Sequence, residues 1–267
     1  MPPLPVLLVT GAGGVLGSTL LPDLREKYTL RVTDRVQPAG PERDQTLLGD
    51  LADPAFAAKA VAGVDAILHL AAYASPRASW PEAAPNAGIT QNVLTAAATH
   101  GVHRIVLASS NHAAGLNYRQ GHLPVDPAGA ALPCCPYGAA KLAEEALGRL
   151  HALRTGATVI SLRFGLVGWP LEERDYNAMW LSDRDASALV RAALEAGGSG
   201  VHFGVSRYAE QFWSLAGARA DLHYDPVDRL PPGAEELPWS AASPCLMFDP
   251  HGAPRAAGSA QSPHLPD

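Results

Sequence analysis

The sequence TGAGGVLG, from Thr10 to Gly17, follows the apolar run VLLV and leads into a stretch whose leucines recur at helical spacing. Glycines allow a tight turn between a strand and a helix, where unpaired N–H groups and the positive end of the helix dipole favour a phosphate group. The same three glycines, Gly11, Gly14 and Gly17, are also compatible with a purely structural turn. Other parts of the chain must distinguish these two interpretations.

Short apolar runs alternate with longer helical patterns along the chain. The apolar runs cover residues 4–10, 30–34, 65–71, 103–110 and 158–164. The helical patterns between them cover residues 17–27, 54–63, 88–101 and 137–154. This alternation is typical of a parallel sheet with helices on both faces. We therefore predict an α/β fold, with a Rossmann-type doubly wound parallel sheet and a small C-terminal substrate-binding part.

An acidic residue, Asp34, stands at the end of the second apolar run. In a dinucleotide-binding fold a carboxylate at this place accepts hydrogen bonds from the ribose hydroxyls and repels a 2′-phosphate. The glycine turn is therefore interpreted as a cofactor site, and NAD is favoured over NADP. The alternative stays open because the next residue, Arg35, can bind a 2′-phosphate.

Composition narrows the class of partner. The 267 residues are 47% hydrophobic and 17% charged, with a formal net charge of −6. With this negative charge we expect a small-molecule partner and no nucleic acid. We also expect no membrane association and a cytoplasmic location, because neither a long apolar span nor a secretory leader is visible. Cys134, Cys135 and Cys245 have no metal-ligand spacing, so we expect free thiols and no metal site.

A second group of residues suggests proton transfer. Ser110 ends a predicted buried strand, and Tyr137 and Lys141 lie four residues apart on one predicted helix, hence on the same face. A lysine ammonium beside a tyrosine favours the phenolate and lowers its pKa toward neutrality, which makes a general base. The acidic pair at 144–145 on the same helix is interpreted as a solvated surface, and Asn86 either supports the site or caps its helix.

At this point the chain resembles the extended short-chain dehydrogenase/reductases. The matching phrases are TGAGGVLG, Asp34, GDLAD, HLAA, QNVLTAA after Asn86, ASSNH, YGAAK and LRFG. The resemblance implies that the turn binds the NAD pyrophosphate and that Ser110, Tyr137 and Lys141 are catalytic. The cofactor-binding residues that it implies are Gly11, Gly14, Val15, Leu16, Gly17, Asp34, Arg35, Asp50, Leu51, Leu70, Ala71, Ala72, Tyr137 and Lys141.

Within that family the phrase RIVLASSNHAAG is most similar to uronate dehydrogenases, which oxidise a uronic acid to an aldarolactone. The resemblance implies a sugar or sugar-acid substrate, with Tyr137 as general base and hydride passing to NAD. The substrate-binding residues that it implies are Ser75, Ser110, Asn111, His112, Tyr137 and Arg174. Arg174 would bind the substrate carboxylate, and Leu166 stands where these enzymes have a serine. Homodimerisation through the helix that carries YGAAK is also implied.

Three parts are expected along the chain. Residues 1–165 form an NAD-binding Rossmann domain, residues 166–245 form a small substrate-binding region packed on it, and residues 246–267 form a flexible tail rich in proline and small residues. Two alternative functions remain open. One is a nucleotide-sugar epimerase or dehydratase that retains its NAD, and the other is a non-catalytic dinucleotide-binding regulator.

Overall fold

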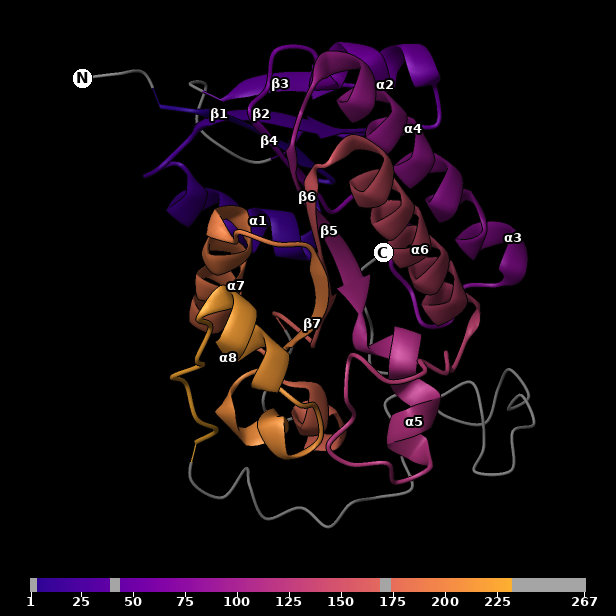
Figure 1. Ribbon diagram of the computed structural model, residues 1–267, viewed down its shortest axis with the longest axis vertical. Helices are drawn as coiled ribbons and strands as arrows, with labels where there is room; N and C mark the ends of the chain where they lie inside the picture. Colours follow the sequence, from indigo (N-terminus) through magenta and orange to yellow (C-terminus); the bar gives the residue numbers. More distant parts are fainter. Residues whose placement is uncertain (1–3, 39–43, 169–173, 232–267) are drawn as a thin grey trace.

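The computed structural model describes residues 4–38, 44–168 and 174–231, and within them seven parallel strands form one sheet (Figure 1). The strands are β1 (Val6–Thr10), β2 (Thr29–Asp34), β3 (Gln45–Leu48), β4 (Ala66–His69), β5 (Arg104–Ser110), β6 (Thr158–Phe164) and β7 (Gly200–Gly204). Their order across the sheet is β3-β2-β1-β4-β5-β6-β7. The order reverses direction between β1 and β4, which confirms the predicted Rossmann-type sheet and marks the crevice where such folds bind their ligands.

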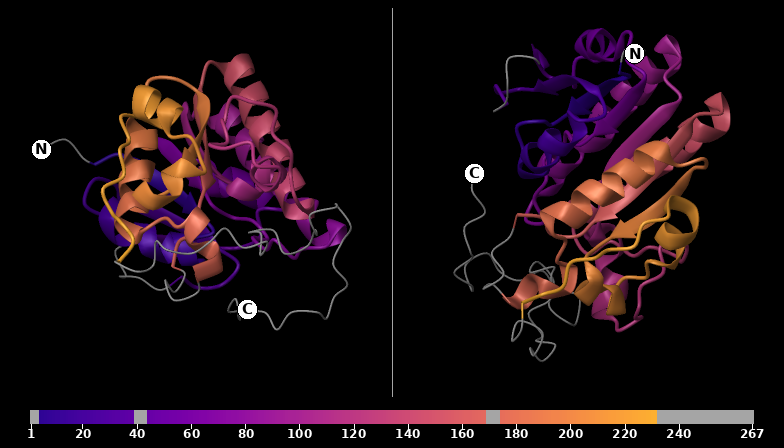
Figure 2. Two further views of the ribbon diagram at one scale, coloured as in Figure 1. Left: turned by 90° about the horizontal axis from the view of Figure 1, so that it is seen from below. Right: turned by 90° about the vertical axis from the view of Figure 1, so that its left-hand side faces the viewer.

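Helices cover both faces of the sheet (Figures 1 and 2). One face carries α2 (Pro54–Val61), α4 (Pro85–His100) and α6 (Pro136–Thr155), which lie side by side. The other face carries α1 (Val15–Leu24), α7 (Asp183–Glu195) and, beside α7, α8 (Ala216–Leu222). The shorter helices are α3 (Trp80–Ala83), η1 (Asn111–Ala114), α5 (Gly115–Arg119), η2 (Arg174–Met179) and η3 (Arg207–Gln211). None of the described helices combines the length and apolar character needed to span a bilayer.

The apolar strands build a core on each face of the sheet because successive side chains point in opposite directions. Leu7 and Val9 of β1 pack into the core that α1 and α7 cover, whereas Leu8 packs into the core under α2 and α4. The side chains of Leu7, Leu8 and Val9 are fully buried. A strand buried on both faces reads as a continuous apolar run, and this is why the sequence located it.

The five apolar runs became β1, β2, β4, β5 and β6, but the sequence analysis did not predict β3. This strand, with the sequence QTLL, lies at the edge of the sheet and pairs only with β2 among the described strands. Its side chains are half-buried or exposed. Without the burial of a central strand it has no continuous apolar signal.

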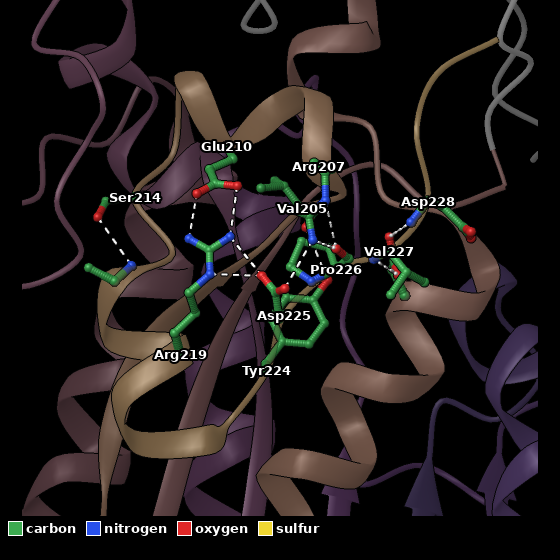
Figure 3. Close-up of polar contacts among 12 residues, drawn as sticks. Val205, Arg207, Glu210, Ser214, Arg219, Tyr224, Asp225, Pro226, Val227 and Asp228 are labelled. Carbon is green, nitrogen blue, oxygen red and sulfur yellow. Dashed lines mark hydrogen bonds and ion pairs between the residues drawn. The ribbon is translucent and has the colours of Figure 1, made fainter.

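The region after residue 165 joins the same sheet, because it supplies β7 at the edge beside β6 and α7 on the face of α1. The chain after α8 is tied down by polar contacts (Figure 3). The Tyr224 hydroxyl donates to the Val205 carbonyl at 3.0 Å, and the Val227 N–H donates to Asp185 Oδ1 at 2.9 Å. Arg219 binds both Glu210 and Asp225. The expected tail at residues 246–267 lies outside the described residues.

Candidate active site

The glycine turn lies between β1 and α1, at the carboxyl edge of the sheet. Gly11 has a φ of +66°, and a Cβ there would lie 2.6 Å from the Ala71 nitrogen, so only glycine fits. Gly14 is the N-cap of α1 and offers no side chain to cap the helix. The first turn of α1, which includes Val15 and Leu16, contains no acidic residue. The N–H groups at this helix end are therefore suited to an anion, as the sequence predicts.

Gly17 provides the close packing behind the turn, since a Cβ there would lie 2.6 Å from the Ala12 carbonyl oxygen. Asp34, at the end of β2, faces the turn directly. Its Oδ2 accepts from the Gly13 N–H at 2.9 Å, and its Oδ1 accepts from the Arg35 N–H at 2.6 Å. The carboxylate thus stands beside the glycine turn, where the sequence analysis expects it. The chain's own residues fit a dinucleotide here.

The remaining predicted cofactor residues line the same edge. Asp50 and Leu51 follow β3, where Asp50 Oδ1 accepts from the Ala52 N–H at 2.9 Å and Leu51 is buried. Leu70, Ala71 and Ala72 follow β4 and are half-buried. The loops after four adjacent strands therefore gather the predicted cofactor residues around the switch point.

A buried chain of polar side chains connects β1, β4 and α4, and the sequence analysis did not identify it. Thr10 Oγ1 lies 2.8 Å from His69 Nδ1, and His69 Nε2 lies 3.0 Å from Thr90 Oγ1. The Thr10 hydroxyl also accepts the N–H groups of Leu70 and Ala71, both at 3.1 Å. Burial, with a smaller contribution from the Lys141 charge, lowers the pKa of His69 to about 3. This histidine is therefore neutral and fixes the loop after β4 against the glycine turn.

Ser110, Tyr137 and Lys141 are brought together, as predicted. Ser110 ends β5, and its side chain lies close enough to Tyr137 to lower the pKa of the tyrosine hydroxyl. Tyr137 and Lys141 lie on the first turns of α6, with Lys141 Nζ 5.7 Å from the centre of the Tyr137 ring. All three side chains are almost completely buried.

The electrostatics of Tyr137 differ from the sequence-based expectation. Burial raises the pKa of the Tyr137 hydroxyl, and Lys141 and the Ser110 hydrogen bond lower it only in part. The expected net shift toward neutrality is therefore wrong for this site, because removal of the phenolate from water costs more than the ammonium returns. Burial alone lowers the pKa of Lys141, but the nearby Glu144 and Tyr137 raise it above its usual value, so the ammonium stays charged.

The acidic pair on α6 is buried, so its interpretation as a solvated surface is wrong. Glu144 Oε2 accepts from Lys141 Nζ at 3.0 Å, and Glu145 forms a bidentate ion pair with Arg163 of β6, with both N···O distances at 2.8 Å. Glu144 is a buried partner of Lys141 that sequence reasoning missed. The available signal was its spacing, because Tyr137, Lys141 and Glu144 follow i, i+4, i+7 and share one helix face.

Asn86 does not cap its helix, whose N-cap is Ala84, and it binds the loop after β4 instead. Its side chain is buried, accepts from the Tyr73 N–H at 2.8 Å and donates to the Tyr73 carbonyl at 3.2 Å, which holds the loop after β4. In that loop Ser75 is half-buried, and its hydroxyl accepts from the Arg77 N–H at 3.2 Å. Asn86 therefore fixes the segment in which a substrate contact was predicted.

The predicted substrate contacts after β5 have different surroundings. Asn111 is buried. With its amide in the orientation that satisfies both its oxygen and its nitrogen, the nitrogen donates to the carbonyls of Arg163 at 2.8 Å and Phe164 at 3.2 Å. The half-buried His112 meets Tyr137 edge-on, with the ring centres 6.0 Å apart. Arg174 begins η2, and its side chain lies outside the described residues.

Comparisons with known proteins agree with this geometry. The NAD dependent epimerase/dehydratase family matches residues 7–197. An NAD-dependent glucose-6-phosphate dehydrogenase of Haloferax volcanii is 33% identical over 84% of this chain and 93% of its own. A uronate dehydrogenase of Pseudomonas syringae pv. tomato is 33% identical over 83% of this chain and 82% of its own.

Among solved structures, a uronate dehydrogenase from Agrobacterium tumefaciens complexed with NAD is similar to this chain. The TM-score is 0.75 and the sequence identity 31%, with 84% of this chain and 85% of the other covered. The likeness thus extends well beyond the nucleotide-binding half of the sheet. Because the family match covers most of the chain and the dehydrogenase relatives share nearly its whole fold, the chain belongs to the NAD-dependent epimerase/dehydratase family and is an NAD-dependent dehydrogenase of CH–OH groups.

Proposed function

We propose that this dehydrogenase oxidises a hydroxyl of a sugar or uronic acid, in the manner of a uronate dehydrogenase, and that Tyr137 is its general base. The observation that carries the proposal is the meeting of the Tyr137 hydroxyl with Ser110 and the Lys141 ammonium at the carboxyl edge of the sheet. A regulator that only sensed NAD would not need a buried tyrosine held in this way. The substrate class is supported by the uronate and sugar-phosphate dehydrogenases to which the chain is similar.

Each residue of the trio has a role in proton transfer. Ser110 and Tyr137 together bind the substrate hydroxyl, and Tyr137 accepts its proton as the C–H hydride leaves. Lys141 stabilises the phenolate by its positive charge, and Glu144 keeps that lysine protonated and in place. The bound NAD supplies the hydride acceptor. The product is a carbonyl or lactone, with one proton released from the enzyme to solvent in each cycle.

The substrate would be selected by residues around this trio. We assign hydrogen bonds with substrate hydroxyls to His112 and Ser75, and to Asn111 through its side-chain oxygen, since its amide nitrogen binds backbone carbonyls. We assign the substrate anion to Arg174, whose guanidinium can bind a carboxylate bidentately. A phosphate on a sugar would satisfy the same arginine. Uronic acids and glucose 6-phosphate are therefore the first substrates to compare.

The experiment is a substrate panel with the purified protein. Galacturonate, glucuronate, glucose 6-phosphate and neutral sugars are each tested with NAD and with NADP, and reduced cofactor is followed by absorbance. We expect turnover with an anionic sugar and NAD, and a kcat that rises with pH because the pKa of Tyr137 is raised. A folded protein that reduces NAD with none of these sugars would refute the proposed substrate class.

The role of Tyr137 is tested by Tyr137→Phe, with Tyr28→Phe as the matched control. Tyr28 directly precedes β2, so it lies at the amino ends of the parallel strands, whereas Tyr137 lies at their carboxyl ends. We expect the first variant to lose at least about 100-fold in kcat while NAD binding persists, and the control to keep wild-type activity. Turnover without consumption of added NAD would favour an epimerase, and full activity of Tyr137→Phe would refute the general-base assignment.

The proposal includes a homodimer formed through α6 and its neighbour. Leu150 and Leu153 on α6 are 44% and 80% exposed, which suits an apolar interface. Analytical ultracentrifugation should show a dimer that Leu153→Glu weakens, and a monomeric wild-type protein would refute it. A reducing cytoplasmic location is supported by Cys134 and Cys135, which are not joined in a disulfide. The net charge of −6 supports a small-molecule partner over nucleic acid.

A further inference from the structure

Two cysteines and a histidine from separate segments meet beside the active site. His112 lies on η1 after β5, whereas Cys134 and Cys135 directly precede α6. His112 Nδ1 is 3.3 Å from Cys134 Sγ and 3.9 Å from Cys135 Sγ, and the three ligand atoms all lie within 4.8 Å of one another. The sequence spacing gave no sign of this cluster, because the histidine is far from the cysteines along the chain.

The two nitrogen–sulfur distances are close to those in a tetrahedral zinc site. With Zn–S bonds of about 2.3 Å and Zn–N bonds of about 2.0 to 2.1 Å, a tetrahedral angle separates N and S by about 3.6 Å and two sulfurs by about 3.8 Å. The observed 3.3 and 3.9 Å lie on either side of the first value. The two sulfurs lie no more than 4.8 Å apart, so shifts of up to about 1 Å would bring all three atoms onto one metal ion.

The surrounding backbone holds the cluster rigidly. Cys134 is 2% exposed and Cys135 is 4% exposed. The Cys134 N–H donates to the His112 carbonyl at 3.2 Å, and a Cβ on Gly138 would lie only 2.2 Å from that carbonyl oxygen. A Cβ on Gly115 would lie 2.3 Å from Cys134 Sγ, so glycine leaves the space that this sulfur fills. Preorganised ligands lose little entropy on binding a metal.

The charges are also favourable. Cys135 Sγ caps α6, accepting from the Gly138 N–H at 3.4 Å, and a helix N-terminus stabilises a negative sulfur. A divalent ion would displace one proton from each thiol to solvent and form two metal–thiolate bonds and one metal–imidazole bond. The resulting group has no net charge, so its burial avoids the cost of an isolated ion.

We propose that His112, Cys134 and Cys135 bind a thiophilic divalent metal ion of the zinc class and that the bound metal inhibits the dehydrogenase. Inhibition rests on the proposed function, in which His112 contacts substrate. Coordination through Nδ1 draws the imidazole toward the sulfurs and leaves Nε2 only as a hydrogen-bond donor. Small displacements of a substrate-positioning group reduce turnover strongly, and we expect at least a fivefold loss of activity.

Metal binding is measured without substrate. The full-length protein is treated with chelator and reductant, exchanged into metal-free buffer and titrated with zinc chloride against a chromophoric zinc indicator. We expect the wild type to bind one zinc ion tightly per chain. Cys134→Ser or Cys135→Ser should weaken zinc binding at least tenfold, and the double variant Cys134→Ser/Cys135→Ser should not bind zinc. Cobalt chloride should give a thiolate-to-cobalt charge-transfer band that the double variant lacks.

Cys245→Ser is the matched control, because Cys245 is the third cysteine of the chain. It should bind zinc like the wild type, and circular dichroism should show all variants folded. Wild-type zinc affinity no tighter than that of the double variant, or an equal loss in Cys245→Ser, would overturn the site. A Cys134–Cys135 disulfide that persists in reductant, seen as a mass lower by two hydrogens, would also overturn it.

The inhibitory effect is measured separately. Zinc should lower the rate of NAD reduction in the wild type, and chelator should restore it. The double serine variant should show the same rate with zinc as with chelator. Zinc binding without inhibition would overturn the regulatory part alone. Absence of any sugar-dependent activity would instead refute the proposed function, while the indicator and cobalt measurements would still decide the metal site.

Discussion

Replacement of Glu145 by glutamine isolates the ion pair that fixes α6 to the sheet. Glu145 of α6 binds Arg163 of β6 through two 2.8 Å contacts, and its Oε1 accepts from the Ser109 hydroxyl of β5 at 2.5 Å. Both charged side chains are 3% exposed. The substitution keeps the shape of the side chain but leaves the Arg163 guanidinium buried without its counter-charge.

The expected cost is large for a single atom-for-atom replacement. Removal of one partner of a buried ion pair lowers the free energy of unfolding by about 3 to 5 kcal/mol, against a total stability of about 5 to 15 kcal/mol. The matched control is Glu195→Gln, because Glu195 pairs with Lys27 at 3.0 Å while both side chains are more than half exposed. An exposed pair contributes only about 0 to 1 kcal/mol.

Urea unfolding followed by tryptophan fluorescence measures both variants, since Trp213 is fully buried and reports on the core. The double variant Glu145→Leu/Arg163→Met should recover most of the loss, because no charge then remains buried. A loss below about 1 kcal/mol in Glu145→Gln, or a double variant whose loss equals the sum of the two single losses, would refute the reasoning.

Three further predictions concern Lys141, the glycine turn and the pH dependence of stability. Lys141→Met removes a charge 5.7 Å from the centre of the Tyr137 ring, and that charge interacts with the phenolate by about 3 kcal/mol at an effective dielectric constant of about 20. The kcat should therefore fall about 100-fold, and an unchanged kcat–pH profile would contradict this. Gly11→Ala should abolish NAD binding measured by calorimetry, because its Cβ would lie 2.6 Å from the backbone after β4. The control Gly63→Ala has a similar φ of +71° but no atom within 4 Å of its Cβ, so it should bind NAD normally; equal affinities of the two variants would exclude the steric argument. His69 is neutral in the folded protein, with a pKa of about 3 against 6.5 when unfolded, so the unfolded chain gains a proton as pH falls below 6.5 and stability is lost down to about pH 3. Between pH 6 and 4 the wild type should therefore lose about 1 kcal/mol per pH unit more than His69→Asn, and parallel stability curves would disprove it.

Much of the fold could be predicted because its signals are local. A strand buried on both faces is a continuous apolar run, and five of the seven strands were recognised in this way. The edge strand β3 has no such signal, since its side chains are only partly buried. The glycine turn, Asp34 and the Tyr137–Lys141 spacing are likewise encoded within short segments whose geometry follows from strand and helix periodicity.

The sequence by itself therefore determined the Rossmann-type sheet and the glycine turn, and it predicted the members of the proposed catalytic trio, because these depend on near neighbours along the chain. Only the tertiary structure decided what surrounds them. Glu144 and Glu145 are buried because neighbouring elements cover that side of α6, and burial raises the pKa of Tyr137 against the pull of Lys141. The approach of His112 to Cys134 likewise depends on the path of the intervening loop. Burial and long-range contact arise only when the whole chain is packed, so no local pattern encodes them.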